Sequence, residues 1–266
     1  MRLKTEASEV QSPFAWRRPG KVLYAIRGKV LDGSKFRYSA TGLLESIETS
    51  LANYNRWIVS RFIREFRRHR YQSVLDFGAG IGSLAVLFKA MTGVTPLTLE
   101  VDGEQRAMLS RRGFSPVASI DQLPGDIDMI YTSNVLEHIP DDIAALRELR
   151  DHLAPGGRIF IFVPAFPALW TTVDDKVGHV RRYTKAALRQ SLDEAGLKLE
   201  SIRYTDPVGF LLVILFKLVG SQSGVPSDRS YFIFDRLLFP VSRLLDWVTS
   251  PFFGRSVFAV ASKGEP

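Results

Sequence analysis

The chain contains no cysteine in its 266 residues. This absence excludes a disulfide scaffold, thiolate metal sites and every mechanism that uses a cysteine nucleophile. Long apolar runs are also missing. The stretch Val208–Phe216 is shorter than the ~20 residues that cross a bilayer, and residues 1–16 hold no apolar segment of signal-peptide length. The sequence shows no internal repeat and no low-complexity tract. We therefore expect a folded, cytoplasmic protein.

Positive charge is in modest excess. Lys and Arg number 35 against 28 Asp and Glu, which gives a formal net charge of +7, and hydrophobic residues make up 45% of the chain. A basic chain with this much apolar character favours a membrane face or an anionic substrate as its partner. The alternative is a soluble protein whose arginine-rich helices are simply solvated. The charge balance leaves both interpretations open.

The order of apolar segments predicts three regions. Residues 1–40 mix Pro, Gly and Arg with short apolar pieces, and we expect an irregular arm there. Residues 41–206 begin with helical periodicity and continue as strand-like runs that alternate with helix-like ones. This alternation indicates an α/β fold, a doubly wound and mostly parallel sheet with helices on both faces. Residues 207–266 predict an apolar, amphipathic helical appendage with a candidate last strand at Val257–Ala261. The strands expected in the core are 73–77, 97–101, 116–120, 129–133, 158–163 and 197–204.

The clearest local signal is a glycine-rich turn between a strand and a helix. The segment Val74–Leu84 contains the pattern GAGIG at positions 78–82. Glycines tolerate positive φ and let a ligand approach the backbone, and doubly wound sheets bind ligands at this carboxyl edge. The spacing differs from the G-x-G-x-x-G of dinucleotide sites. Because Asp76 precedes the first glycine by two residues, the pattern favours a ligand with an amino-acid tail, whose ammonium group a carboxylate attracts.

A second acid follows the next predicted strand. Glu100 lies at the end of Leu97–Val101, where a carboxylate can accept hydrogen bonds from both hydroxyls of a ribose. Asp102 is the alternative for this role. We favour Glu100 because it comes earlier, at the strand edge.

Two further segments complete the pattern: Asn134–His138, with the sequence NVLEH, and Leu153–Arg158, with the sequence LAPGGR. With the glycine turn and Glu100, they make residues 54–204 resemble the class I S-adenosylmethionine-dependent methyltransferases. The resemblance implies a seven-stranded sheet and S-adenosylmethionine as the cofactor. It implies that the glycines line the methionine part, Glu100 binds the ribose, Asn134 lies near the sulfonium, and the loop at 119–121 reaches the adenine. The cofactor-binding residues expected on this basis are Asp76, Gly78, Ala79, Gly80, Gly82, Glu100, Val101, Ile120, Asn134 and Tyr54.

The acceptor side depends on a polar segment after the predicted fifth strand. Residues 164–183, and the helix around Tyr54 that precedes the glycine turn, resemble a subgroup of bacterial methyltransferases of polysaccharide, lipid or secondary-metabolite pathways. In that subgroup the helix covers the cofactor. Imidazole titrates near neutral pH, so His138 and His179 are the candidate catalytic bases; each has a structural hydrogen bond as its alternative. The expected acceptor-binding residues are Trp170, Asp174, Arg181, Arg182 and Tyr183. For the two arginines, salt bridges to Asp174 or Asp175 are the alternative.

The sequence thus predicts methyl transfer to a small-molecule or lipid-linked acceptor, most simply at oxygen. The alternatives are a nucleic-acid methyltransferase and a non-catalytic protein that binds S-adenosylmethionine. Nucleic acid is disfavoured because Asn134 begins the sequence NVLE rather than the Asn/Asp-Pro-Pro-Tyr of amino-methylating enzymes. No His and carboxylate spacing is typical of a metal site, so we expect direct transfer without a metal. The appendage either shapes the acceptor pocket or lies peripherally on the inner membrane face. The oligomeric state stays open.

Overall fold

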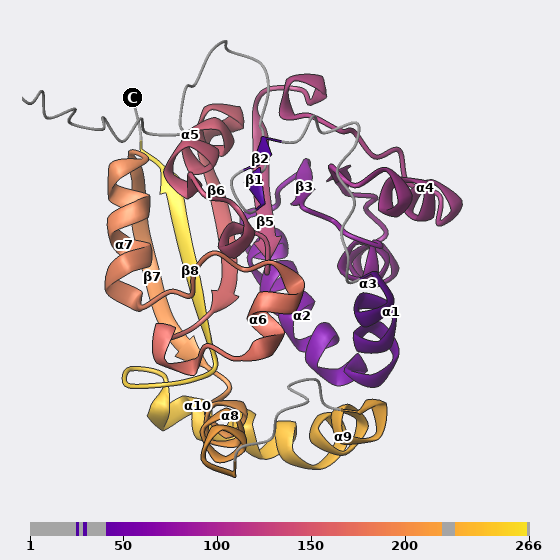
Figure 1. The fold of residues 1–266 in the computed structure, drawn as a ribbon. Helices are drawn as coiled ribbons and strands as arrows, with labels where there is room; N and C mark the ends of the chain where they lie inside the picture. Colours follow the sequence, from indigo (N-terminus) through magenta and orange to yellow (C-terminus); the bar gives the residue numbers. More distant parts are fainter. Residues whose placement is uncertain (1–24, 27–28, 31–40, 220–226, 265–266) are drawn as a thin grey trace, which may run out of the picture.

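The computed structural model describes residues 25–26, 29–30, 41–219 and 227–264. Its centre is a six-stranded sheet in the order β4-β3-β5-β6-β8-β7 (Figure 1). The strands are β3 (Val74–Phe77), β4 (Leu97–Leu99), β5 (Ile127–Ser133), β6 (Leu153–Pro164), β7 (Leu197–Thr205) and β8 (Ser256–Lys263). Strand β3 is parallel to β4 and β5, and β5 is parallel to β6, whereas β8 is antiparallel to both β6 and β7. The predicted α/β doubly wound fold is confirmed.

Side chains on the central strands alternate between two cores, one on each face of the sheet. On β6, Ile159 and Ile161 belong to one core, and Phe160 and Phe162 belong to the other. The first core is completed by α5 and α7, and the second by α2 and α3. Both faces are buried, which is why these strands are nearly continuous apolar runs. The helices are α1 (Thr41–Ser50), α2 (Ala52–His69), α3 (Ser83–Thr92), α4 (Gly103–Arg111), α5 (Asp142–His152), α6 (Thr172–Val177), α7 (Lys185–Glu194), α8 (Pro207–Val219), α9 (Asp228–Ile233) and α10 (Phe239–Thr249).

The prediction of a seven-stranded sheet is not met in the described part of the chain. The segment expected as a strand at 116–120 makes one parallel bridge, between Val117 and Leu99, and then turns into a short 3-10 helix at Ile120–Gln122. Pro116 has no N–H to donate, which limits a ladder at this edge. The N-terminal arm lies outside the described residues except for a short antiparallel pair, β1 (Ala25–Ile26) and β2 (Lys29–Val30).

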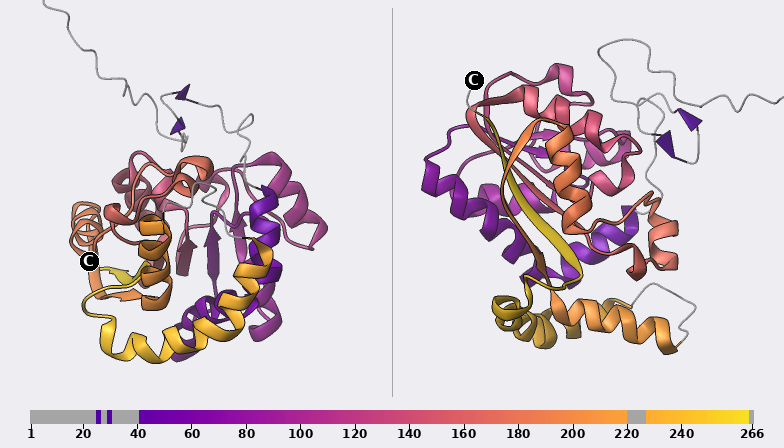
Figure 2. Two further views of the ribbon diagram at one scale, coloured as in Figure 1. Left: turned by 60° about the horizontal axis from the view of Figure 1, so that its bottom comes forward. Right: turned by 90° about the vertical axis from the view of Figure 1, so that its left-hand side faces the viewer.

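The appendage is an excursion between the last two strands rather than a tail. The chain leaves the sheet after β7, forms α8, α9 and α10 at one end of the molecule, and returns as β8 between β6 and β7 (Figure 2). Asp206 joins the two ends of the excursion: it is fully buried, and its Oδ2 lies 2.9 Å from Nε of Arg255. No helix in the described ranges has the length and apolar character needed to cross a bilayer.

Candidate active site

A cavity of about 370 Å³ lies where β3, β4 and β5 end. Its wall is built from helices α1 and α2, the turns that follow these three strands, residues of the segment 173–182, and Tyr231 and Arg255 of the appendage. Most of the residues predicted to bind the cofactor line it: Tyr54, Asp76, Gly78, Ala79, Gly80, Glu100, Val101 and Asn134. Segments far apart in sequence therefore meet at one edge of the sheet, as the doubly wound topology requires.

The glycine turn brings the backbone into this wall. Gly78 has a φ of +74°, and a Cβ atom there would lie 2.4 Å from Cγ2 of Val135. Only glycine fits at this position without moving the turn after β5. Gly82, predicted to bind the cofactor, is not in the cavity lining. Its own missing Cβ makes room for Leu109, 2.6 Å from where that atom would be, so Gly82 serves the packing of α3 against α4.

Glu100 connects the glycine turn to the end of β4. Its Oε2 accepts a hydrogen bond from the N–H of Gly80 at 2.8 Å, and its Oε1 accepts one from the N–H of Asp102 at 2.8 Å. Burial raises the pKa of this carboxyl, while the two N–H donors act in the opposite direction. The alternative ribose ligand, Asp102, instead caps helix α4: its Oδ1 accepts from the N–H groups of Glu104 and Gln105, at 2.9 Å each. The geometry therefore favours Glu100 over Asp102.

Asp76 is a buried acid at the floor of the cavity. Its Oδ2 accepts a hydrogen bond from the hydroxyl of Tyr131 at 3.1 Å. Burial raises its pKa to about 8, since no cation among the described residues offsets the desolvation of the carboxylate. A ligand ammonium group would supply the missing positive charge. This environment suits the predicted role toward an amino-acid tail.

Ile120, predicted to reach the adenine, does not line the cavity. It lies in the 3-10 turn at 120–122, and its side chain is buried in the core beside Leu123 and Ile127. The apolar residue of this loop therefore packs inward rather than toward the ligand. Its adenine contact remains a prediction that the geometry does not favour.

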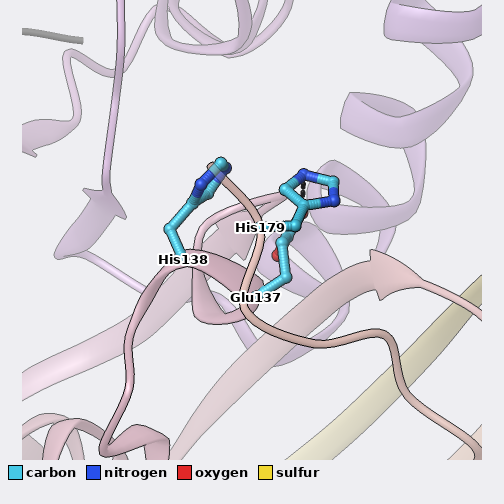
Figure 3. Close-up of side chains that lie close together, drawn as sticks. All are labelled: Glu137, His138 and His179. Atoms are coloured by element: carbon cyan, nitrogen blue, oxygen red, sulfur yellow. Dashed lines mark ion pairs between the residues drawn. The ribbon is translucent and has the colours of Figure 1, made fainter. Parts of the chain in front are cut away.

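Both candidate histidines line the cavity. Figure 3 shows their two rings near each other, with Glu137 beside them. Nδ1 of His179 lies 2.7 Å from Oδ1 of Asp174, and its Nε2 lies 3.7 Å from Oε1 of Glu137. Nδ1 of His138 lies 3.4 Å from the carbonyl oxygen of Gly178, and the two imidazole rings are 4.7 Å apart. Burial, followed by the charge of His179, lowers the pKa of His138 to about 3. His138 is thus a neutral imidazole near pH 7, and His179 is hydrogen-bonded to Asp174 and lies near Glu137 without a hydrogen bond to it.

Of the five predicted acceptor-binding residues, one lines the cavity and four do not. Arg182 lines it and donates to both oxygens of Asp174, at 2.7 and 3.0 Å. Burial alone would raise the pKa of Asp174, but the hydrogen bonds from His179 and Arg182 lower it. This salt bridge is the alternative that the sequence left open for Arg182.

Arg181, Tyr183 and Trp170 lie outside the cavity lining. Arg181 pairs with Asp142 rather than with an acid of its own segment. Tyr183 is 2% exposed and donates its hydroxyl hydrogen to Asp142 at 2.8 Å. Trp170 donates from Nε1 to Asp175 at 3.2 Å. The polar atoms named here are engaged within the protein, and contact of these side chains and of Asp174 with the acceptor remains a prediction.

Several residues of the site were missed by sequence reasoning. Gln105, Tyr231 and Arg255 line the cavity, and Glu137 lies directly behind His179. Glu137 had a local signal, because it precedes His138 in the NVLEH segment. Arg255 and Tyr231 had no local signal in the sequence. Tyr231 lies in α9 of the appendage and Arg255 directly before β8, so only the tertiary fold brings them to the cavity.

Comparison with known proteins defines the class to which this fold and site belong. The family of methyltransferase domains matches residues 50–202, more than half of the chain. The chain belongs to this family: it is a class I S-adenosylmethionine-dependent methyltransferase domain, and S-adenosylmethionine is its cofactor.

One curated relative and two solved structures illustrate the likeness. Trans-aconitate 2-methyltransferase of Deinococcus radiodurans is 32% identical over 103 residues, which are 36% of this chain and 39% of that protein. The chain thus spans about two-fifths of the length of that relative. The Haloferax volcanii complex of the Trm112 methyltransferase activator with a methyltransferase has a TM-score of 0.53 at 16% identity, covering 86% of this chain and 95% of that one. Haemonchus contortus phosphoethanolamine N-methyltransferase 2 has a TM-score of 0.51 at 12% identity, with coverages of 87% and 61%. At these identities the solved structures show the shared fold.

Proposed function

We propose that the chain transfers the methyl group of S-adenosylmethionine to an oxygen of a small-molecule or lipid-linked acceptor. The observation that supports this best is the continuity of the cavity, which runs from the glycine turn and Glu100 to His138 and His179. A methyl donor on one side and an acceptor on the other would meet inside it. Methyl transfer from a sulfonium needs such alignment in a dry site more than it needs chemical activation.

The cofactor end of the cavity is assigned as follows. The backbone at Gly78, Ala79 and Gly80 lies along the methionine part, whose ammonium group faces Asp76. Glu100 accepts hydrogen bonds from the ribose hydroxyls, and the neighbouring Val101 packs against the ring system. This assignment rests on the cavity lining and on the polar groups it presents.

The sulfonium lies at Asn134 in this proposal, and Tyr54 of α2 covers it. Tyr54 is 6% exposed and stacks edge-on against Phe162 and Phe239. Its backbone N–H is held by Asp235 of the appendage, at 2.8 Å, so the cover is fixed from outside the core. A fixed aromatic cover excludes water from the reacting atoms.

The reaction is a single displacement at the methyl carbon. The acceptor oxygen forms a bond to this carbon while the carbon–sulfur bond breaks and leaves its electron pair on sulfur, which yields S-adenosylhomocysteine. An acceptor hydroxyl must also lose its proton. His138 and His179 are the titratable groups that line the far end of the cavity, and we assign the handling of this proton to that end.

The apolar surface of the appendage supports a lipid-linked acceptor. Of fifteen large apolar side chains that are exposed in the described residues, all but Val86 and Val180 lie between residues 211 and 252. Trp247 is 89% exposed and Leu244 is 78% exposed. Monomeric soluble proteins rarely expose apolar patches of this kind, and apolar side chains beside cations are typical of helices that lie in a membrane interface.

The charges of the appendage support the same proposal. Arg229, Arg236 and Arg243 are exposed, whereas Asp235 and Asp246 are buried and bonded to the backbone of the core. The outer face thus presents mainly cations to its surroundings, which complements anionic headgroups. We therefore place the protein peripherally on a membrane, with the cavity close above it and a lipid-linked acceptor entering from that side.

A small soluble acceptor is the second form of the proposal. The Deinococcus relative is described as acting on trans-aconitate, and the Haemonchus structure contains phosphomonomethylethanolamine. Arg255 and Arg182 line the cavity and place positive charge there, which would suit an anionic acceptor of this size, although each is also paired with an aspartate, Asp206 and Asp174 respectively.

Methyl-labelled S-adenosylmethionine distinguishes these acceptors. The protein is incubated with a total cell extract, and the label is divided among lipid, aqueous small-molecule and nucleic-acid fractions. Label in the lipid or the aqueous fraction supports the proposal and chooses between its two forms. Label confined to nucleic acid, or no label in any fraction while the cofactor still binds, contradicts it.

A further inference from the structure

Glu137, His138 and His179 form a compact cluster, and its two histidines line the cavity (Figure 3). Each residue offers one ligand atom, and these atoms all lie within 4.8 Å of one another. Glu137 and His138 belong to the short 3-10 helix at Leu136–His138, while His179 follows α6. The fold therefore brings Glu137 and His138 together with His179, which follows them by 42 and 41 residues, and this spacing in the sequence does not indicate a metal site.

The carboxylate of Glu137 lacks the partners that a buried acid ordinarily has. The residue is 0% exposed, and neither carboxylate oxygen has a hydrogen-bond donor from another of the described residues. Buried polar atoms in native proteins are nearly always paired, so an orphaned carboxylate calls for a ligand. Glu137 is also the residue that places the backbone of the segment: its carbonyl oxygen accepts from the N–H of Val180 at 2.8 Å.

The separation of Glu137 from His179 fits a shared ion better than a direct bond. Nε2 of His179 lies 3.7 Å from Oε1, which is too long for a hydrogen bond. Two ligand atoms held at ~2.1 Å from one tetrahedral ion are about 3.4 Å apart. A contraction of a few tenths of an ångström would bring both atoms to bonding distance from an ion between them.

Both imidazoles are oriented in the way that metal ligands ordinarily are. His179 has Asp174 at 2.7 Å from Nδ1, which directs Nε2 toward Glu137. His138 has the carbonyl oxygen of Gly178 at 3.4 Å from Nδ1. A carboxylate or a carbonyl behind the second ring nitrogen fixes the ring and its tautomer, and such pairs support metal-binding histidines in many proteins.

We propose that Glu137, His138 and His179 hold one divalent transition-metal ion in the wall of the cavity that faces the acceptor. Two imidazoles and one carboxylate suit Zn²⁺, Mn²⁺, Fe²⁺ or Co²⁺, whereas Mg²⁺ and Ca²⁺ prefer oxygen ligands alone. The prediction from the sequence was that no metal takes part, so this inference departs from it. With three protein ligands the ion keeps open positions, and it would supply Lewis-acid polarisation to an acceptor hydroxyl. That role, but not the binding itself, rests on the proposed function.

Metal binding is tested on the full chain with any affinity tag removed and with no methyl donor present. The protein is dialysed against a chelator and then equilibrated with Zn²⁺, with Mg²⁺ in large excess, and the retained metal is counted by mass spectrometry. The expected result is one Zn²⁺ per chain that Mg²⁺ does not displace. Substitution with Co²⁺ adds an absorption spectrum that reports nitrogen and oxygen ligands in the unmodified protein.

Variants locate the ion. Glu137→Gln and His179→Gln are expected to weaken Zn²⁺ binding by more than about tenfold. His152→Gln and His69→Gln remove the two histidines outside the cluster and are expected to leave binding unchanged. Retained binding of S-adenosylhomocysteine shows that a variant is folded. The proposal is overturned if the unmodified chain retains no Zn²⁺ and shows no Co²⁺ spectrum, or if the cluster variants bind as well as the two controls. Neither result depends on methyl transfer, so failure of the metal proposal and failure of the proposed function would be observed in different experiments.

Discussion

Oε2 of Glu100 lies 2.8 Å from the backbone nitrogen of Gly80, and this hydrogen bond joins the ends of two neighbouring strands. The glycine turn and the acid that follows β4 therefore form one unit rather than two separate ligand contacts. A carboxylate held in this way keeps its orientation without a ligand, which reduces the ordering that a bound ribose has to impose. The positions of the glycines and of Glu100 are thus linked, and a change in one is expected to affect the other.

Gly78→Ala is expected to weaken cofactor binding at least tenfold. The new Cβ would meet Val135 at 2.4 Å, and a φ of +74° strains any residue with a side chain. Gly93→Ala is the matched control, because Gly93 has a φ of +78° but nothing within 4 Å of the added atom. Both variants should lose roughly 1–2 kcal/mol of unfolding free energy from the backbone alone. Calorimetric titration with S-adenosylmethionine separates them, and equal dissociation constants would count against the assigned turn.

Asp102→Ala is expected to lower stability without a comparable loss of affinity. Its carboxylate caps α4 through two backbone N–H groups at 2.9 Å, and loss of such a cap costs about 1 kcal/mol. Urea unfolding measures this loss, and a cofactor titration of the same variant should give a dissociation constant within about twofold of the unmodified value. An affinity loss as large as that of a Glu100 variant would return Asp102 to the role of ribose ligand.

Cofactor affinity is expected to rise with pH between about 6 and 8. Burial raises the pKa of Asp76 to about 8, so at pH 6 the free protein carries this group mainly protonated and without charge. Binding of an ammonium group favours the carboxylate, so each unit of pH below 8 should change the affinity by up to about tenfold. The same raised pKa means that the stability of the ligand-free protein falls as pH rises toward 8.

Asp76→Asn is the control for this pH dependence. It removes the titrating group, so its affinity should be low and nearly constant over the same interval. Calorimetry at several pH values gives both profiles. Parallel slopes in the two proteins would assign the proton to another group.

Removal of exposed apolar side chains from the appendage is expected to abolish membrane binding. The double variant Leu244→Ser, Trp247→Ser removes two side chains that are 78% and 89% exposed, and burial of each at an interface contributes about 1.5–3 kcal/mol. Flotation with liposomes that contain anionic lipid should show co-migration of the unmodified protein at low salt and its loss in the variant. Val86→Ser, an exposed apolar residue on α3, is the matched control. Absence of the unmodified protein from the liposome fraction would contradict the interfacial proposal.

Features that depend on local sequence were predicted well. The strand, glycine turn and helix at Val74–Leu84 follow from adjacent residues, and the mostly parallel sheet with helices on both faces follows from the alternation of strands and helices. The segment 116–120 does not form the expected strand, because it pairs with the sheet only through the bridge between Val117 and Leu99. The periodicity of a sequence does not reveal how many hydrogen bonds a segment makes with a neighbouring strand. The last strand was identified, but its place between β6 and β7 was not.

Features that depend on tertiary contacts were not accessible from the sequence. Arg181 and Tyr183 are adjacent to a cavity-lining arginine, yet both are directed to Asp142 on α5. Their residue types suggested an acceptor site, whereas the contacts that the fold gives them are with Asp142, which no local pattern predicts. Glu137 lies in a motif that the sequence analysis identified, but no binding role was predicted for it. The fold makes it a candidate metal ligand by placing Nε2 of His179 3.7 Å from its Oε1.

The most direct test of the account is a calorimetric titration of the unmodified chain and of Glu100→Gln with S-adenosylmethionine. We predict one bound cofactor per chain and a loss of about 1.5–3 kcal/mol of binding free energy in the variant, the value of hydrogen bonds to a charged group. This loss corresponds to a dissociation constant that is roughly tenfold to hundredfold larger. No binding by the unmodified chain, or equal binding by both proteins, would contradict the assigned cofactor site.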